Sequence, residues 1–247
     1  MGGGGESGHE RCGVLVVSAK GRGSEVIPLE NYPTSAWATQ RYVEHALRQG
    51  HPLLGHLLEP MAGEGAIIRA VNACVPFRPS WTAIEIRGEE LPLLFASGVQ
   101  HAYTLDTFAY LDSLTSEKWF DHTITNPAFS KAFKLLLALW EKSTWITLLL
   151  RLNWLEGGKD EMTGRERSEW LRTNMPDVAI LPNRPPFSVN QKGKPGTDAT
   201  SYAWMTWGPH SRGATEGKVT LLQRTPDEVR RAHTAELRAR TKKVVTE

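Results

Sequence analysis

Two short loops carry groups that suit the two halves of one transfer reaction. The first is Glu59-Pro60-Met61-Ala62-Gly63-Glu64-Gly65, called the glycine loop below. Its glycines permit a tight turn and a close approach of the backbone to a ligand, so this loop can hold a nucleotide-like donor. The second is Asn126-Pro127-Ala128-Phe129, called the asparagine loop, which follows an apolar run and can hold a planar amino group. The order and spacing of the pair are a stronger signal than either loop alone.

The donor half of the site is expected at the ends of three strands. A helix after the glycine loop would point its first amide groups at the ligand. Glu85 can accept both hydroxyls of a ribose, and Asp106 can accept from the amino group of an adenine while Phe108 lies on its ring. A dinucleotide fingerprint would place a third glycine near Ile68, and its absence argues against NAD.

The acceptor half depends on the asparagine loop. An amine on an aromatic ring is a poor nucleophile because its lone pair is conjugated into the ring. The side-chain oxygen of Asn126 and the backbone carbonyl of Pro127 can draw such an amine toward tetrahedral geometry, and Phe129 can stack on the base. Alignment and preorganised dipoles would then supply most of the rate, without a strong general base. A turn, a helix cap or a core contact explains each residue equally well on its own, and only the pairing of the loops favours the functional reading.

The segments around these loops alternate between strands and helices, which predicts a mostly parallel, doubly wound α/β sheet. Strands are expected at 14–18, 56–58, 81–86, 101–105, 120–125, 144–152 and 201–207. Helices are expected from Thr34 or Ser35 onward, at 66–73, 91–97, 131–142 and 166–172, and from Thr225 to the end. In such sheets ligands bind beyond the carboxyl ends of the strands, and both loops fall there.

Composition suits a globular protein with one substantial core: 247 residues, 40% apolar and 23% charged. Neither a bilayer-spanning run nor a signal-like N-terminus is present, so we expect a cytoplasmic protein. Cys12 and Cys74 form no metal-like cluster and are expected to be free thiols, with no metal site.

The chain is expected to divide into a flexible segment (1–30), a catalytic domain (31–209) with a polar insert (153–200), and a basic tail or helix (210–247). Net charge is only +2, so any contact with nucleic acid must come from local basic patches. Arg184, Lys192 and Lys194 in the insert are expected to contact phosphates. Trp204 and Trp207 are expected in the core, and the final basic helix is expected to be a solvated tail without a site.

These motifs, in this order, resemble those of S-adenosylmethionine-dependent amino-methyltransferases of the DNA adenine-N6 type, in the small form common in phages and prophages. The resemblance covers about residues 31–207. The glycine loop resembles the family's donor loop through Glu59, Pro60, Gly63 and Gly65, and Glu85 resembles its ribose-binding acid. Asp106 and Phe108 resemble its adenine-binding pair, and the asparagine loop resembles its catalytic tetrapeptide.

A further likeness is Tyr32-Pro33-Thr34-x-x-Trp37-Ala38, which resembles the segment that closes over the methionine end of the donor, with Tyr32, Thr34 and Trp37 as contacts. The resemblance implies a Rossmann-like class I methyltransferase fold, S-adenosylmethionine as cofactor and DNA as partner. Two positions depart from the pattern, because Ala128 replaces the second proline of the tetrapeptide and Ser35 stands where proline is often found. Transfer to cytosine N4, to a base in RNA or to a protein glutamine fits the same tetrapeptide, as does a DNA-binding relative impaired by Ala128.

Overall fold

The computed structural model describes residues 33–115, 119–156, 158–160, 165–186, 188–189, 195–196 and 200–246. The expected strand at 14–18 and three expected site residues, Tyr32, Lys192 and Lys194, lie outside these ranges.

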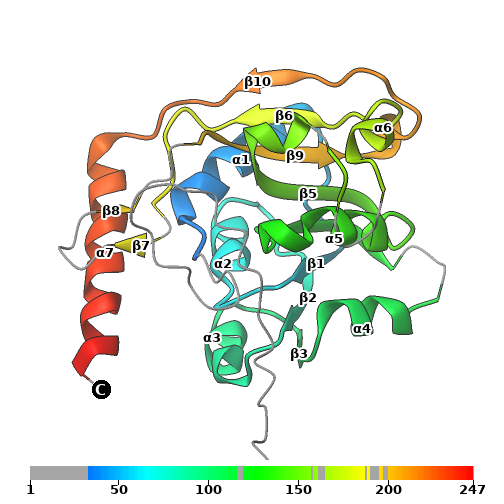
Figure 1. Ribbon diagram of the computed structural model, residues 1–247. Coiled ribbons are helices and arrows are strands. Elements are labelled where there is room, and N and C mark those ends of the chain that lie inside the picture. Colours follow the sequence, from blue (N-terminus) through cyan, green and yellow to red (C-terminus); the bar gives the residue numbers. More distant parts are fainter. Residues whose placement is uncertain are drawn as a thin grey trace, which may run out of the picture.

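A twisted sheet of eight strands forms the centre of the molecule, in the order β10-β6-β9-β5-β4-β1-β2-β3 (Figure 1). Strand β9 runs antiparallel to both its neighbours, β5 and β6, and the other pairings are parallel. The strands are β1 His56–Pro60, β2 Ser80–Glu85, β3 His101–Thr104, β4 Phe120–Thr125, β5 Ser143–Arg151, β6 Asp177–Ile180, β9 Tyr202–Trp207 and β10 Val219–Leu221. A separate antiparallel pair consists of β7 Ser188–Val189 and β8 Pro195–Gly196.

Helices cover both faces of this sheet. The longer ones are α1 Ala36–Gln49, α2 Ala66–Asn72, α3 Leu91–Ala96, α4 Thr107–Ser113, α5 Ala132–Leu139, α6 Arg167–Leu171 and α7 Asp227–Thr246. Short 3-10 turns lie at Gly88–Glu90, Phe129–Lys131, Leu152–Glu156 and Pro209–Ser211. Residues of α1, α2 and α3 share one buried apolar cluster, and residues of α4, α5 and α6 share the other.

Alternating side chains of the strands supply both clusters. Leu57 belongs to the cluster under α1 and α2, and its neighbour Leu58 belongs to the cluster under α5. Because both faces of the central strands are buried, β5 and β9 are rich in apolar residues, whereas β4 also buries polar residues such as His122 and Thr123. Trp204 and Trp207 lie fully inside the core, as predicted.

The sequence did not lead us to predict α4, β6, β7, β8 or β10. Strand β6 lies within the range expected to be a polar insert, and β10 lies within the range expected to be a tail. Both strands are short, so their pairing with neighbouring strands, rather than local propensity, fixes them. Among the described residues, no helix is long and apolar enough to cross a membrane.

Gly65 fixes the packing of α2 against α3. It precedes α2 with φ of 75°, a left-handed conformation that glycine adopts readily. A Cβ atom at this position would lie 2.8 Å from both Cβ and Oγ of Ser97 and 3.2 Å from a methyl carbon of Leu94. The glycine is therefore required by close packing as well as by backbone conformation.

We expect Gly65→Ala to lower the free energy of unfolding by about 2–4 kcal/mol, because it adds a steric clash to a strained φ angle. The matched control is Gly50→Ala, which has φ of 73° and no neighbouring atom within 4 Å of the added Cβ. The control should cost only about 1 kcal/mol. Urea denaturation of both variants measures the difference, and equal losses would contradict the packing role of Gly65.

Candidate functional site

The two loops lie side by side because the strands that precede them are neighbours. Strands β1 and β4 pair in parallel, with Leu58 opposite Thr123. At the ends of these strands the hydroxyl of Thr125 donates a hydrogen bond to the backbone oxygen of Pro60 at 2.5 Å. The glycine loop and the asparagine loop therefore leave the same edge of the sheet at adjacent points, which we call the carboxyl edge.

The glycine loop has an unusual backbone. Met61 and Gly63 have positive φ angles of 58° and 55°, and Gly65 follows with 75°. A positive φ is costly for a residue with a side chain such as methionine, so the surrounding structure must hold it in place. A Cβ atom at Gly63 would meet only a guanidinium nitrogen of Arg87, at 3.7 Å. Gly63 thus leaves room next to the backbone where Gly65 does not.

Glu85 ends β2 and faces this loop. One carboxylate oxygen accepts the backbone N–H of Gly63 at 2.7 Å. The other accepts the backbone N–H of Arg87 at 3.0 Å and its Nε–H at 2.8 Å. Arg87 also pairs with Glu90 at 2.8 Å. A hydroxyl that binds the second oxygen must therefore compete with the guanidinium group of Arg87.

Glu59 lies at the base of the same loop and is only 2% exposed. Burial raises the pKa of its carboxyl well above the ordinary range, while the backbone N–H of Ile68 and the charge of Arg69 oppose the shift. Its Oε2 atom has no hydrogen-bond partner among the described residues. Burial therefore favours the protonated form of this acid, and one buried polar atom is available for a ligand or a water molecule.

Asp106 and Phe108 have structural contacts in addition to their predicted role. Asp106 caps α4, and one carboxylate oxygen accepts the N–H groups of Phe108 and Ala109 at 2.9 Å and 3.1 Å. The ammonium of Lys134 lies 4.2 Å from the centre of the Phe108 ring. These contacts tie the end of β3 to α5, and the predicted contact of both residues with an adenine remains a prediction.

Ile86 was not identified from the sequence. It directly follows Glu85, and its apolar side chain is 52% exposed. An exposed aliphatic residue beside a buried strand-end carboxylate offers a surface for a flat ring. The signal in the sequence was its position immediately after the acid.

The asparagine loop is supported by an aromatic and a cationic neighbour. Pro127 is buried, and Asn126 and Phe129 are half-buried. The ring of Phe129 lies 5.9 Å from that of Tyr202 and 4.8 Å from the guanidinium carbon of Arg151, measured between centres. Arg151 Nε also donates to the hydroxyl of Tyr202 at 3.3 Å. Arg151 and Tyr202 lie opposite each other on the adjacent strands β5 and β9, and sequence reasoning did not place them here.

The start of α1 reaches the same region. Thr34 and Trp37 are buried, and Trp37 shares a core cluster with Ala62 of the glycine loop and with Phe129. The indole N–H of Trp37 has no hydrogen-bond partner among the described residues. Arg184 is exposed and follows β6, whose carboxyl end points to the same edge of the sheet.

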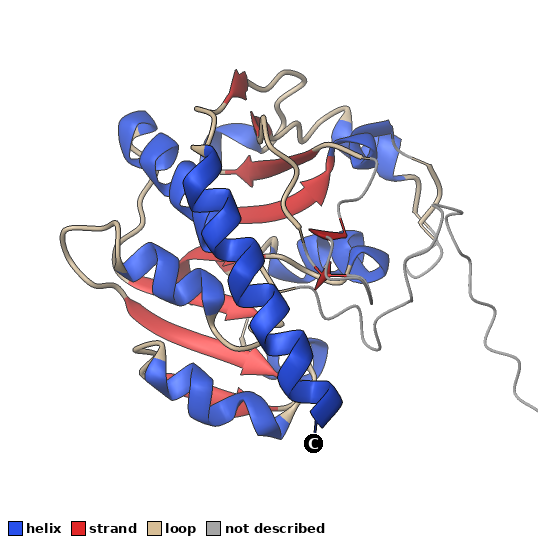
Figure 2. Cartoon of the chain, turned by 90° about the vertical axis from the view of Figure 1, so that its left-hand side faces the viewer, coloured by secondary structure: helices blue, strands red, loops and turns tan. Residues whose placement is uncertain are grey.

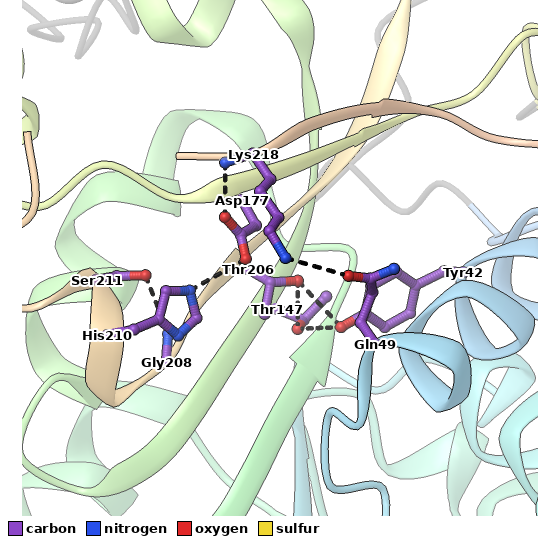
Figure 3. A network of polar contacts seen from close by, with 9 residues as sticks. All are labelled: Tyr42, Gln49, Thr147, Asp177, Thr206, Gly208, His210, Ser211 and Lys218. Atoms are coloured by element: carbon purple, nitrogen blue, oxygen red, sulfur yellow. Dashed lines mark hydrogen bonds and ion pairs between the residues drawn. The ribbon is translucent and has the colours of Figure 1, made fainter. Parts of the chain in front are cut away.

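A cavity of about 430 Å³ lies at the opposite edge of the sheet, away from both loops. It is lined by residues that include His51, Trp145, Asp177, His210 and Lys218. Figure 3 shows that Asp177 links His210, at 3.0 Å, to the backbone N–H of Lys218, at 2.7 Å. Because the cavity lies at the edge of the sheet opposite both loops, we assign it no part in the site that they form.

The Glu59→Gln variant tests the ionisation of the buried acid. Since the folded-state pKa of Glu59 is raised, the native protein retains a proton that the unfolded chain releases above its own pKa. Native stability should therefore fall as the pH rises, by up to about 1.4 kcal/mol per unit, until Glu59 ionises in the folded state. Relative to the native protein, Glu59→Gln should gain stability as the pH rises above about 4.3, the ordinary pKa of a glutamate, until Glu59 ionises in the folded state.

Urea denaturation across that range provides the measurement, and the exposed Glu89→Gln is the matched control. A stability difference between native protein and Glu59→Gln that stays constant with pH would show that the carboxyl is already ionised in the fold.

Comparison with known proteins places the fold. No protein-family model matches the sequence, and no curated protein matches it. A protein of Pyrococcus horikoshii assigned as an RNA methyltransferase superimposes with a TM-score of 0.51 at 14% identity, over 73% of this chain and 88% of the other. The methyltransferase subunit of a type I restriction-modification system from Streptococcus thermophilus superimposes with a TM-score of 0.57 at 15% identity, over 83% of this chain.

The present chain spans 51% of the length of that restriction-modification subunit. The strand order agrees with these superpositions, because the sheet is mostly parallel and its antiparallel strand β9 lies between β5 and β6. The chain therefore has the Rossmann-like fold of class I methyltransferases.

Proposed function

We propose that this protein transfers a methyl group from S-adenosylmethionine to the exocyclic N6 amino group of adenine in DNA. The observation that supports it most is the contact between the ends of β1 and β4, which brings the glycine loop beside the asparagine loop. In this fold such a junction brings a donor-binding loop and an acceptor-binding loop to one crevice.

The residues around the glycine loop fit the proposed donor. Glu85 is a buried strand-end carboxylate, and with Gly63 it forms a polar wall suited to a ribose. Two buried polar atoms, Oε2 of Glu59 and Nε1 of Trp37, have no partner among the described residues and can bind polar groups of the donor. We further assign Thr34, Pro60, Gly65, Asp106 and Phe108 to this half of the site, together with Tyr32, which lies outside the described residues. S-adenosylmethionine supplies an electrophilic methyl group on a sulfonium, so the protein needs no additional activation of the donor.

The asparagine loop would bind and orient the acceptor. The carbonyl oxygens of Asn126 and Pro127 accept hydrogen bonds from the amine, which makes its lone pair available for attack. The ring of Phe129 stacks on the base and is itself held by Arg151 and Tyr202. Ala128 retains both acceptors and loses only the rigidity of a second proline.

A base inside a duplex cannot reach this loop, so the target must flip out or already be single-stranded. Arg184, Lys192 and Lys194 are assigned to the phosphates around it. The two fold relatives bear names that refer to RNA methylation and to restriction-modification, which supports nucleic acid as the substrate class.

The direct test incubates the purified protein with methyl-labelled donor and mixed-sequence DNA, then digests the DNA to nucleosides. We expect label in N6-methyl-2′-deoxyadenosine. Label in N4-methylcytosine, in an RNA substrate or in a protein glutamine would identify one of the other acceptors. DNA binding without label anywhere would indicate a relative impaired by Ala128, and restoring proline at this position should then recover activity.

Asn126→Ala is expected to reduce methyl transfer by about 10²-fold or more, because it removes one of the two acceptors that orient the amine. The dissociation constant of S-adenosylhomocysteine, measured by calorimetry, should stay within about twofold of the native value. Asn174→Ala is the matched control, since Asn174 precedes β6 at the opposite edge of the sheet. Weakened donor binding in Asn126→Ala would count against an acceptor role.

Glu85→Ala is expected to raise the dissociation constant of S-adenosylhomocysteine by about tenfold or more, because a charged hydrogen-bond acceptor is lost. Arg87→Ala should bind at least as tightly as the native protein, since it removes the group that competes for the Glu85 carboxylate. Calorimetry on both variants separates the effects, and an unchanged constant in Glu85→Ala would remove this residue from the site.

A further inference from the structure

Helix α7 runs across the carboxyl edge of the sheet, which is the edge from which both loops leave. In Figure 1 it stands beside the ends of the parallel strands, and Figure 2 shows it passing in front of the sheet. Its sequence is basic and mostly polar, so it was expected to be a solvated tail without a site. Its position at the edge from which both loops leave suggests instead that it contributes to the site.

Specific contacts fix α7 in this position. The imidazole Nε2 of His233 lies 2.8 Å from the hydroxyl of Ser35, which is fully buried at the start of α1. Just before the helix, the N–H of Thr225 donates to the side-chain oxygen of Asn183 at 2.9 Å. Leu237 is 6% exposed, so the middle of the helix also packs against the protein. The helix is therefore held directly beside the segment that contains Thr34 and Trp37.

The outward face of α7 is suited to a polyanion. Arg231 and Arg238 are exposed and seven residues apart, which places them on one face of the helix about 10 Å from each other along its axis. Ala235 lies between them and is also exposed, so only a small side chain stands between the two arginines on this face. The acids Asp227 and Glu228 lie in the first turn, where Asp227 is paired with Arg230. Glu236 is exposed between the two arginines in the sequence, and its carboxylate lies 3.8 Å from Nδ1 of His233.

We propose that α7 is a second DNA-contacting surface, in which Arg231 and Arg238 bind phosphates of the strand that presents its base to the asparagine loop. This inference rests on the proposed function for the identity of the partner. A separation of about 10 Å corresponds to about three phosphate steps along one strand, at 3.4 Å per step along the duplex axis. A protein partner would favour large apolar or aromatic side chains between the arginines, whereas a sugar–phosphate backbone favours small ones.

A helix that binds DNA beside the two loops must be anchored to the rest of the protein, and its anchor lies close to a second basic residue. Arg184 lies at the end of β6 on the same edge of the sheet, and α7 reaches this region through the contact of Thr225 with Asn183. Arg184 and the arginines of α7 thus present positive charge at two separate points of one edge.

The test compares the double variant Arg231→Ala/Arg238→Ala with the native protein. Binding to a labelled mixed-sequence DNA duplex, and to its single strand, is measured by fluorescence anisotropy at several salt concentrations. We expect the dissociation constant at low salt to rise by about tenfold or more, and the salt slope to fall by about 1–2, as expected when two phosphate contacts are lost.

Two controls make the result specific. The double variant Arg48→Ala/Arg78→Ala removes the same charge from exposed positions at the opposite edge of the sheet and should leave the slope unchanged. Arg231→Lys/Arg238→Lys keeps the charge and should restore most of the slope, which a merely structural role of the guanidinium groups would not allow. The dissociation constant of S-adenosylhomocysteine should be the same in all variants.

Equal slopes for the native protein and Arg231→Ala/Arg238→Ala would overturn the inference, as would the absence of DNA binding by the native protein. Failure of the proposed function looks different. In that case the native protein would label no nucleoside, while the loss of affinity and slope in the α7 variant would still assign this helix to DNA.

Discussion

The parallel pairing of β1 with β4 is the constraint on which the rest of this structure depends. The chain builds β1, β2 and β3 outward in one direction and then returns to place β4 on the other side of β1. Helices α1, α2 and α3 therefore cover one face, and α4 and α5 cover the other. Where the direction of winding changes, the connections from two neighbouring strands separate toward opposite faces and leave a crevice. The bond from Thr125 to Pro60 closes the sheet just beneath that crevice.

The electrostatics of the donor half follow from its burial. Glu59 and Glu85 approach the same loop, and the charge of Glu85 adds to the burial that raises the pKa of Glu59. The two acids differ in what surrounds them. Glu85 is paired with Arg87 and bonded to Gly63, whereas Glu59 receives little compensation for its burial. Glu85 thus offers a carboxylate to hydroxyl groups, and burial favours the neutral form of Glu59 under the loop.

Much of the fold could be predicted from local sequence. The central strands are buried on both faces, so most of them are rich in apolar residues and are bounded by loops. Strands β1 to β5 and β9, and the helices at 66–73, 91–97 and 131–142, appear close to their expected positions. The positions of β6 and β10 could not be predicted, since Val178 and Ala179 are strand residues only because β9 and β10 flank them. Helix α4 was missed because Asp106 was interpreted as a ligand contact and its capping role was not considered.

Part of the candidate site could likewise be predicted from the sequence, and part could not. Adjacency of the two loops follows from the order of strands, which the alternating pattern implies. The contacts of Arg87 with Glu85, of Arg151 with Phe129 and of His233 with Ser35 depend on how side chains are oriented in three dimensions. No spacing rule in the sequence predicts these contacts. They determine which groups compete with a ligand and which groups surround it.

The most direct test of the central claim, that the two loops form one site, is a crystal structure of the protein with S-adenosylhomocysteine. We predict that the ribose hydroxyls bind Glu85 in place of the Arg87 guanidinium, and that the sulfur faces the carbonyl oxygen of the Asn126 side chain. Binding in the cavity beside His51 and Trp145, or a sulfur directed away from Asn126, would contradict the account.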